Sequence, residues 1–448
     1  MTSPDTIVAV ASAPGRGAVG IIRVSGPRVR DVARGILGTV PAPRVARLSN
    51  FLDAHGVSLD QGLALYFPGP ASYTGEDVLE LQGHGGALIL DVLQKRLLAL
   101  GCRLARPGEF SERAFLNGKI DIAQAEAIAD LIDAGTTAAA RAAVRSMQGE
   151  FSARIGELQS RITELRGYVE AAIDFPDEEI DFLSTPALSA RLALIFTGFD
   201  SIVTAARQGA LLREGFTVVI AGKPNAGKSS LMNALAHEDV AIVTDLPGTT
   251  RDVLRRSVEL DGLPLNLVDT AGLRSAADAA EAEGVRRARS EITRADHVLY
   301  VIDAVTDGGE GIDELQQGAG AAPITLVFNK IDVTGDAAGL EGGVSPPRIR
   351  VSTKTAAGLD LLRSHLKECA GYHAGDSGAL SARRRHLDAL DRARRHAEAA
   401  ADTLSSTRAF ELFAEDLRMA QRALGEITGE FTSEDLLGQI FGSFCVGK

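Results

Sequence analysis

The chain has 448 residues, of which 45% are hydrophobic and 24% charged; this composition is typical of globular proteins and the length suggests about three domains. The net charge at pH 7 is −12, which excludes nucleic-acid binding by bulk attraction, so any such contact needs a local basic patch. The three cysteines, Cys102, Cys369 and Cys445, lie far apart; their spacing gives neither a disulfide framework nor a zinc motif and fits a reducing cytoplasm. No run approaches ~18 apolar residues, so we expect no membrane span, and the first six residues carry Asp5 but no Lys or Arg, so we expect no signal peptide.

Residues 1–117 alternate short apolar runs with Gly and Pro turns, which predicts a mixed domain of strands and helices. Strands are expected at 7–11 and 20–24, and a helix at 87–100. The sequence then becomes rich in Ala, Leu, Glu, Gln and Arg. Apolar residues recur at helical spacing in two places: Phe151, Ile155, Leu158, Ile162, Leu165 and Val169, and Phe410, Phe413, Leu417, Ala420, Leu424 and Ile427.

Between these two helical segments, apolar runs at 216–221, 265–268, 298–302, 324–328 and 349–351 alternate with helical stretches. This alternation predicts a parallel sheet with helices on both faces. The simplest architecture is an α/β domain inserted into one helical domain, although two separate helical bundles would give the same pattern. Residues 334–346 are Gly-rich and polar and are predicted to form a mobile loop.

A phosphate-loop pattern, G-x-x-x-x-G-K-S, occupies residues 222–229, between the strand at 216–221 and a predicted helix at 230–236. Its glycines let backbone N–H groups converge on phosphate oxygens at a helix N-terminus. We expect Lys228 to contact the β- and γ-phosphates and Ser229 to ligate Mg²⁺.

Three further motifs follow predicted strands. In Asp269-Thr270-Ala271-Gly272, the aspartate is expected to hold the outer shell of the metal and Gly272 to donate its N–H to the γ-phosphate. In Asn329-Lys330-Ile331-Asp332, a carboxylate can accept both the N1–H and the 2-amino group of guanine, which adenine does not offer. In Ser352-Thr353-Lys354, backbone amides would reach the guanine O6. Four motifs in this order predict a guanine-nucleotide switch domain.

The group that activates water is left open by these residues. Ras-type enzymes carry a water-orienting Gln just after the aspartate motif, but this chain has Leu273, which cannot orient water. Asp278, Glu281 and Glu283 in the following loop are candidates, each of which could equally be a solvated acid; a group from a partner is the other alternative.

No arginine finger is evident, because Arg251, Arg255 and Arg274 are better interpreted as solvated surface. A bound monovalent cation would supply the missing positive charge, with Asn225 as an oxygen ligand. The oxygen-rich segment 244–252 could wrap over the site and bring Thr250 to Mg²⁺ and the γ-phosphate.

With these motifs, the whole chain resembles the MnmE (TrmE) family of tRNA-modification GTPases. The resemblance also rests on four less common blocks: Asp5-Thr6-Ile7 with residues 14–17 through Gly26, residues 72–77, residues 106–111 through Gly118-Lys119, and residues 444–448. It implies an α/β and α protein: an N-terminal α+β folate-binding-like domain, a discontinuous helical domain and an inserted Ras-like P-loop GTPase domain with a largely parallel sheet. The implied domains are a tetrahydrofolate-binding and dimerisation domain at 1–117, helical halves at 118–212 and 372–448, and a G domain at 213–371.

The resemblance further implies a potassium-stimulated GTPase whose G domains dimerise when it is activated. It assigns K⁺ to the Asn225 side chain, to the backbone of Thr244 and Leu246, and to Thr249, and it assigns Mg²⁺ to Ser229 and Thr250. Glu281 aligns with the family's water-orienting glutamate and becomes the catalytic candidate. The other implied GTP contacts are Ala226, Gly227, Lys228, Ser230, Asp245, Pro247, Gly248, Asp269, Thr270, Ala271, Gly272, Asn329, Lys330, Asp332, Ser352, Thr353 and Lys354.

The family adds a carboxymethylaminomethyl-type group to C5 of the wobble uridine of certain tRNAs. It forms a cytoplasmic homodimer and works in a heterotetramer or larger complex with the FAD-dependent partner MnmG, using a tetrahydrofolate derivative of the 5-formyl or methylene type. Arg23, Glu80 and Lys119 match its folate positions: a Glu can pair with the pterin amino edge, and Arg and Lys can meet carboxylates. Cys445 and Lys448 match residues that the family places near the folate.

A local basic excess at residues 380–400 could contact tRNA phosphates, or it could be a solvated helix with i, i+3 and i, i+4 ion pairs. The residues concerned are Arg383, Arg384, Arg385, Arg392, Arg394 and Arg395, against Asp388, Asp391 and Glu398. Two other functions stay open. A ribosome-assembly GTPase would usually carry an appended RNA-binding module, and it leaves the N-terminal blocks unexplained. A regulatory switch would perform no chemistry of its own.

Overall fold

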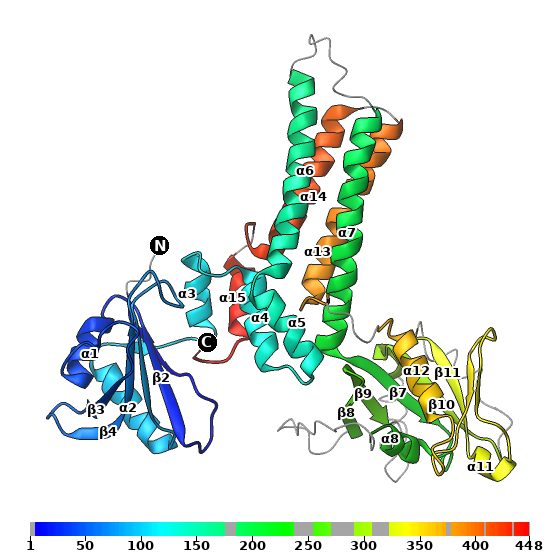
Figure 1. Cartoon of the computed structure of the whole chain (residues 1–448), viewed down its shortest axis with the longest axis horizontal. Helices are drawn as coiled ribbons and strands as arrows, with labels where there is room; N and C mark the ends of the chain where they lie inside the picture. Colours follow the sequence, from blue (N-terminus) through cyan, green and yellow to red (C-terminus); the bar gives the residue numbers. More distant parts are fainter. Residues whose placement is uncertain are drawn as a thin grey trace, which may run out of the picture. The chain divides into compact units, whose positions relative to one another are not determined.

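The computed structural model of the chain (Figure 1) describes residues 5–174, 185–236, 254–269, 291–306, 322–372, 378–406, 409–431 and 434–447. The backbone forms two compact units. Unit 1 comprises residues 1–129, 147–191 and 392–448, and unit 2 comprises residues 130–146 and 192–391. Two long helices, α7 (Thr185–Glu214) and α13 (Arg384–Ser406), continue from one unit into the other along the chain.

Unit 1 begins with a six-stranded sheet in the order β3-β4-β5-β2-β1-β6. Its strands are β1 (Ile7–Val10), β2 (Val19–Ser25), β3 (Arg47–Leu52), β4 (Ser58–Phe67), β5 (Val78–His84) and β6 (Arg103–Leu104). Apolar residues at alternate positions along the strands face one side of the sheet, where they pack against α1 (Val29–Leu37) and α2 (Ala87–Ala99). The other face carries Ile7 and Ala9, which pack against Phe110 of α3 (Glu109–Leu116). The predicted strands and helix of this segment are confirmed to within one residue at each end.

The helices of unit 1 come from both sides of the middle segment. Besides α1, α2, α3 and its parts of α7 and α13, unit 1 contains α4 (Ile122–Ile132), α6 (Glu150–Asp174), α14 (Phe410–Thr428) and α15 (Glu434–Gly442). All six apolar residues predicted for α6 are buried, as are Phe413, Leu417 and Leu424 of α14. The two helices contact each other, and Arg166 of α6 donates a 2.7 Å hydrogen bond to Gln421 of α14. Residues far apart in sequence therefore share one helical core, as the inserted-domain interpretation predicts.

Unit 2 contains a seven-stranded sheet in the order β12-β13-β11-β10-β7-β9-β8. The strands are β7 (Phe216–Gly222), β8 (Leu254–Leu260), β9 (Leu263–Asp269), β10 (His297–Asp303), β11 (Ile324–Asn329), β12 (Gly339–Glu341) and β13 (Arg348–Arg350). The five inner strands are parallel, and β8 and β12 are antiparallel edges. Helices α8 (Lys228–Ala236) and α12 (Leu359–Cys369) pack in one of two hydrophobic clusters on this sheet. The largely parallel sheet is confirmed. Two further helices of this unit are α5 (Thr137–Met147) and the short α11 (Ile331–Thr334).

The prediction of a mobile loop at 334–346 is wrong in its middle part. Residues Gly339–Glu341 form β12, which pairs antiparallel with β13. A three-residue edge strand buries little apolar surface, so its sequence shows no hydrophobic pattern. It forms because its backbone can hydrogen-bond to the neighbouring strand.

One helix in the described residues, Pro186–Glu214 within α7, is long and apolar enough to cross a membrane by length and composition alone. A single helix of this kind is weak evidence, because core helices of globular proteins pass the same test. Its residues Leu192, Ile195, Phe199 and Ile202 are buried and recur at spacings of three and four, which is the pattern of a helix that packs one face in a protein core.

Candidate functional site

The candidate nucleotide site lies at the carboxyl ends of the parallel strands of unit 2. Gly222 ends β7, Asp269 ends β9 and Asn329 ends β11, while Ser352 follows β13 by two residues. Carboxyl ends of parallel strands meet at one edge of a sheet, where ligands of open α/β folds bind. The four predicted motifs therefore reach the same edge.

The phosphate loop requires glycine at both ends for steric reasons. Gly222 has φ +140, and a Cβ added there would lie 2.2 Å from the carbonyl oxygen of Val301. Gly227 has φ +97, and a Cβ would lie 2.2 Å from Nδ2 of Asn329. Asn225 adopts φ 63 with an exposed side chain, a left-handed conformation that asparagine tolerates better than most residues. The loop thus approaches β10 and the base motif too closely for side chains.

Lys228 and Ser229 open α8 directly after this loop. The Lys228 ammonium is buried and donates hydrogen bonds to the carbonyl oxygens of Gly222 (2.9 Å) and Lys223 (2.8 Å). The Ser229 hydroxyl donates to Oδ2 of the buried Asp269 at 3.1 Å. The predicted magnesium ligand and the predicted outer-shell carboxylate are therefore neighbours.

Asn329 joins three of the four motifs, although its side chain is completely buried. Its Nδ2 donates to the carbonyl oxygen of Ala226 in the phosphate loop at 3.0 Å, and its Oδ1 accepts from the backbone N–H of Thr353 at 3.2 Å. Sequence spacing predicts a base motif here, but it does not predict that this amide ties the phosphate loop to the last loop.

The carboxylate predicted to read the base, Asp332, is oriented from the neighbouring loop. The Ser352 hydroxyl donates to Oδ1 of Asp332 at 2.7 Å, and Asp332 is exposed at the strand edge. Lys330 forms a 2.6 Å ion pair with Asp303, the last residue of β10, and its hydrogen bond lowers the pKa of Asp303. Asp303 was not predicted as a site residue; its position at the carboxyl end of a central strand is the signal that could have found it.

Ser230 and Lys354 are exposed at this edge. Several predicted residues lie outside the described part of the chain, and their predictions stand untested: Thr244, Asp245, Leu246, Pro247, Gly248, Thr249, Thr250, Thr270, Ala271, Gly272, Glu281 and Lys448.

Two of the candidate folate residues, Arg23 and Glu80, lie on the face of the unit 1 sheet opposite α1 and α2, where α3 also packs. Arg23 on β2 and Glu80 on β5 are directly opposite each other in the antiparallel ladder and form a 2.9 Å ion pair. The Arg23 guanidinium lies over the rings of Tyr73 and Phe110, 5.6 and 5.7 Å from their centroids. A half-buried ion pair beside two aromatic rings can receive a flat, polar heterocycle.

The C-terminal segment lies beside this face within unit 1. The carbonyl oxygen of Cys445 accepts a 3.3 Å hydrogen bond from the N–H of Gly108. Gly447 approaches Val10 on β1. The preceding residue, Ala9, lies opposite Arg23 in the ladder between β1 and β2. The Cys445 thiol is exposed. Lys119 lies near Gly75. No contact among the described residues joins Lys119 to Arg23 or Glu80.

A buried charge cluster supports the start of α3 next to this face. Glu109 is 2% exposed and accepts hydrogen bonds from Arg103, from Arg113 at 3.0 Å and from the N–H of Arg106 at 2.8 Å. Burial by itself opposes ionisation of Glu109, but these hydrogen bonds outweigh it and lower the pKa of the carboxyl from 4.5 to about 2.

We expect Glu109→Gln to lower the free energy of unfolding of the N-terminal sheet by on the order of 3 kcal/mol at pH 7. The reason is that the ionised Glu109 carboxylate is more stable in the folded state than in the unfolded state. A depressed carboxyl pKa stabilises the fold above pH 4.5, and that stability is lost as the pH falls toward 2. The difference between variant and wild type should therefore shrink below pH 4.5. Native-state hydrogen exchange in β1, β2 and β5 measures it.

Glu112→Gln is the matched control, because Glu112 on the same helix pairs with Arg106, whose side chain is 65% exposed. Exposed pairs contribute about 0–1 kcal/mol. A loss for Glu109→Gln that is the same at every pH would contradict the ionised-state explanation.

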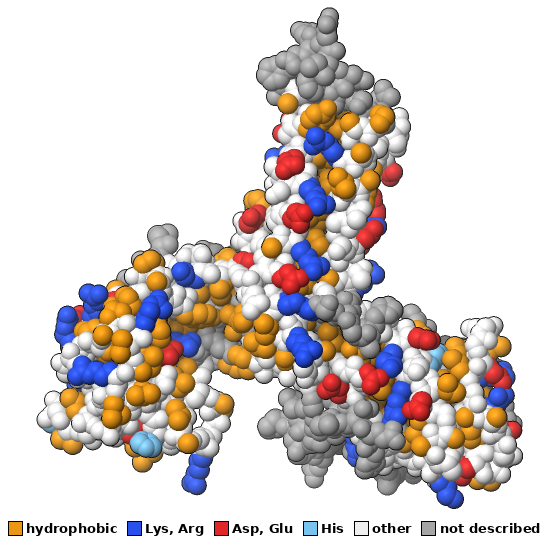
Figure 2. Space-filling view, in the orientation of Figure 1, with side chains coloured by type: hydrophobic (Ala, Val, Ile, Leu, Met, Phe, Trp, Pro, Cys, Tyr) orange, Lys and Arg blue, Asp and Glu red, His pale blue; other side chains and the backbone are white. Residues whose placement is uncertain are grey.

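The basic segment around α13 is largely paired. Arg392 forms a 2.6 Å ion pair with Glu426, Arg394 pairs with Glu398 at i+4, and Arg383 pairs with the buried Asp130. On the face shown in Figure 2, basic and acidic side chains alternate along the long helices. These contacts favour the solvated-helix interpretation over a tRNA-binding patch.

Comparison with known proteins places these features in a family. The family model described as "GTP-binding protein TrmE N-terminus" matches residues 6–119, and the one described as "MnmE helical domain" matches residues 122–445. The proteins named tRNA modification GTPase MnmE from Yersinia pseudotuberculosis serotype IB (strain PB1/+) and from Yersinia pestis bv. Antiqua (strain Angola) are each 57% identical to this chain over 454 residues, covering 100% of both partners.

Among solved structures, the G domain of the FeoB iron transporter of T. maritima is 25% identical, covers 35% of this chain and 98% of its own, and superimposes with a TM-score of 0.28. The match to the MnmE proteins extends over the full chain and includes all three predicted parts. The resemblance read from the motifs is thereby confirmed: the chain belongs to the MnmE family of tRNA modification GTPases.

Proposed function

We propose that this GTPase drives addition of a carboxymethylaminomethyl-type group to C5 of the wobble uridine of certain tRNAs. It acts in the cytoplasm as a homodimer together with an FAD-dependent protein of the MnmG type. Membership of the MnmE family supports the tRNA substrate. The one-carbon unit comes from a tetrahydrofolate derivative bound to the N-terminal domain.

The observation that carries the one-carbon part of this proposal is the half-buried Arg23–Glu80 pair on the sheet face opposite α1 and α2, with the C-terminal segment beside it. A carboxylate can accept hydrogen bonds from the amino edge of a pterin, and a guanidinium can hold a carboxylate of the glutamyl tail. The ring of the half-buried Tyr73 offers a surface for stacking. Lys119, Cys445 and Lys448 complete the proposed set.

In the proposed GTP cycle, Lys228 neutralises the phosphates, and Ser229 and Thr250 hold Mg²⁺. Asp332 reads the guanine edge in the orientation that Ser352 gives it. Asn225 and the segment at Thr244, Leu246 and Thr249 would hold K⁺, which would supply the positive charge that an arginine finger supplies elsewhere. Glu281 orients the attacking water, and hydrolysis is coupled to association of two G domains.

Mass spectrometry of tRNA tests the proposal. We expect a strain without this gene to lose the C5 group from its wobble uridines, and we expect a copy encoding the wild type to restore it. A Lys228→Ala copy present at the same level should fail, because the buried ammonium at the phosphate loop is removed. Unchanged wobble uridines in the deletion strain would leave the ribosome-assembly or regulatory function as the better explanation.

Potassium should accelerate hydrolysis. Replacing K⁺ by Na⁺ at equal ionic strength is expected to slow GTP turnover on the order of tenfold or more, because a charge-stabilising group in the transition state is displaced. The matched variant is Asn225→Gly, since glycine keeps the left-handed backbone at φ 63 and removes only the oxygen ligand. This variant should bind GTP and hydrolyse it slowly in both salts. Equal rates for the wild type in K⁺ and Na⁺ would contradict the cation role.

A further inference from the structure

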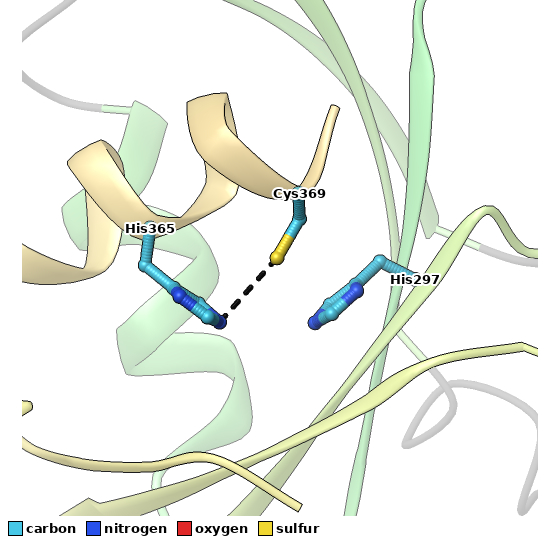
Figure 3. Close-up of side chains that lie close together, drawn as sticks. All are labelled: His297, His365 and Cys369. Atoms are coloured by element: carbon cyan, nitrogen blue, oxygen red, sulfur yellow. Dashed lines mark hydrogen bonds between the residues drawn. The ribbon is translucent and has the colours of Figure 1, made fainter. Parts of the chain in front are cut away.

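A second cluster of chemically active side chains lies in unit 2, at the amino ends of the strands and therefore at the edge of the sheet opposite the nucleotide motifs (Figure 3). His297 is the first residue of β10, and His365 and Cys369 lie on α12. One ligand atom from each of these residues falls within 4.8 Å of the other two. No residue of the nucleotide or folate sites takes part.

The fold brings the three side chains together by simple periodicity. His297, Leu299 and Val301 alternate along β10 and so face the same side of the sheet, where Leu299 and Val301 pack in the cluster that includes α12. His365 and Cys369 are separated by four residues and share one face of their helix. The Cys369 Sγ lies 3.4 Å from Nε2 of His365, and Figure 3 shows both imidazoles pointing toward each other beneath the sulfur.

The hydrogen bonds in this cluster show that the two imidazoles converge on one point. The Thr325 hydroxyl on β11 lies 2.9 Å from Nε2 of His297 and 2.8 Å from Nε2 of His365. A hydroxyl can donate to one imidazole and accept from the N–H of the other, so both Nε2 atoms have a partner here and both approach the same point. The Nδ1 atom of His297, whose side chain is 2% exposed, has no hydrogen-bond partner among the described residues. The observation that suggests an ion is therefore the other nitrogen: the Nε2 atoms of both imidazoles converge beside the Cys369 sulfur, as the ligand atoms of a metal ion do.

We propose that His297, His365 and Cys369 bind a Zn²⁺ ion, with a water molecule or the Thr325 hydroxyl in the fourth position. Zinc bonds of about 2.0–2.1 Å to nitrogen and 2.3 Å to sulfur place tetrahedral ligand atoms roughly 3.3–3.6 Å apart. The distance from Cys369 to His365 already has this value. Nitrogen and sulfur ligands select zinc over magnesium, which requires oxygen.

Zinc binding at this cluster requires the loss of one proton, from Cys369. Zn²⁺ takes the lone pairs of two neutral imidazoles and of the Cys369 thiolate, and the thiol proton is released to solvent. Cys369 is exposed, so the ion can enter from water without opening the core. The bound ion would join the carboxyl end of α12 to the start of β10.

Cobalt spectroscopy on the untagged full-length protein tests the proposal. Mg²⁺ and GDP are added in excess to fill the nucleotide site, and Co²⁺ is then titrated as the probe. We expect one Co²⁺ per chain with a thiolate charge-transfer band and the visible bands of tetrahedral cobalt, all removed by stoichiometric Zn²⁺. Cys369→Ser should abolish the thiolate band and weaken zinc binding by more than the roughly 10- to 100-fold that loss of an outer-shell partner costs.

Cys445→Ser is the matched control, because it removes another exposed cysteine and should keep both the band and the zinc affinity. His365→Gln should lose the tetrahedral bands, and unchanged GDP affinity shows that either α12 variant remains folded. A wild type without a thiolate band, or a band that persists in Cys369→Ser, would overturn the zinc site and identify the cluster as a hydrogen-bonded core network.

Discussion

Asp332→Asn should convert the protein from guanine to xanthine preference. Guanine offers two donors to the carboxylate, and hydrogen bonds to a charged group are worth about 1.5–3 kcal/mol each, so losing both should weaken GTP binding about 10²- to 10⁴-fold. Asparagine can keep its oxygen toward the Ser352 hydroxyl, which donates to Oδ1 of Asp332 at 2.7 Å. Its amide N–H₂ then meets the xanthine 2-carbonyl. Equilibrium binding of GTP and XTP to the wild type and the variant measures the switch.

Asp336→Asn is the matched control for this variant. Asp336 lies four residues further on, is exposed, and has its carboxylate against the Thr334 hydroxyl at 2.7 Å. This control loses the same charge from the same surface, so it separates base recognition from a general electrostatic effect on a triphosphate. Unchanged GTP affinity in Asp332→Asn would refute the base-reading role.

Glu281→Ala should bind GTP normally and lose turnover. Leu273 occupies the position of the water-orienting Gln of Ras-type enzymes and has no polar atom to hold a water molecule, so another group must do this. Removing a general acid–base group costs about 10²- to 10⁴-fold in rate. Affinity should be retained, because the buried Lys228 and the Ser352–Asp332 pair lie in other segments. Single-turnover hydrolysis, with a separate binding titration, distinguishes the two effects.

The same segment of sequence supplies the controls, Asp278→Ala and Glu283→Ala, which remove an acid within three residues of Glu281. Both should hydrolyse GTP at nearly the wild-type rate. If all three variants are equally slow, the loop acts through its overall charge; if Glu281→Ala is as active as the wild type, the water is oriented by another group.

Local patterns were sufficient for the elements that bury a continuous apolar face. The 4-3-4-3-4 spacing from Phe151 to Val169 predicted α6, and all six residues are buried, because a helix of this length must hide one stripe. The inner strands were found to within two residues at each end for a similar reason. The edge strand β12 was missed, because a short edge element depends on its neighbour's hydrogen bonds and not on its own composition.

By itself, the sequence determined the residue types of the nucleotide motifs, the strand ends that carry them and the family, because each depends on residues close together in the chain. Only the tertiary structure decided that Asn329 ties Ala226 to Thr353, that Arg23 lies opposite Glu80, and that His297 meets His365 and Cys369. Except for the His365–Cys369 pair on one helix, these contacts join residues that are 24 to 103 positions apart in the sequence. They depend on strand register and helix packing, which spacing along the chain does not encode.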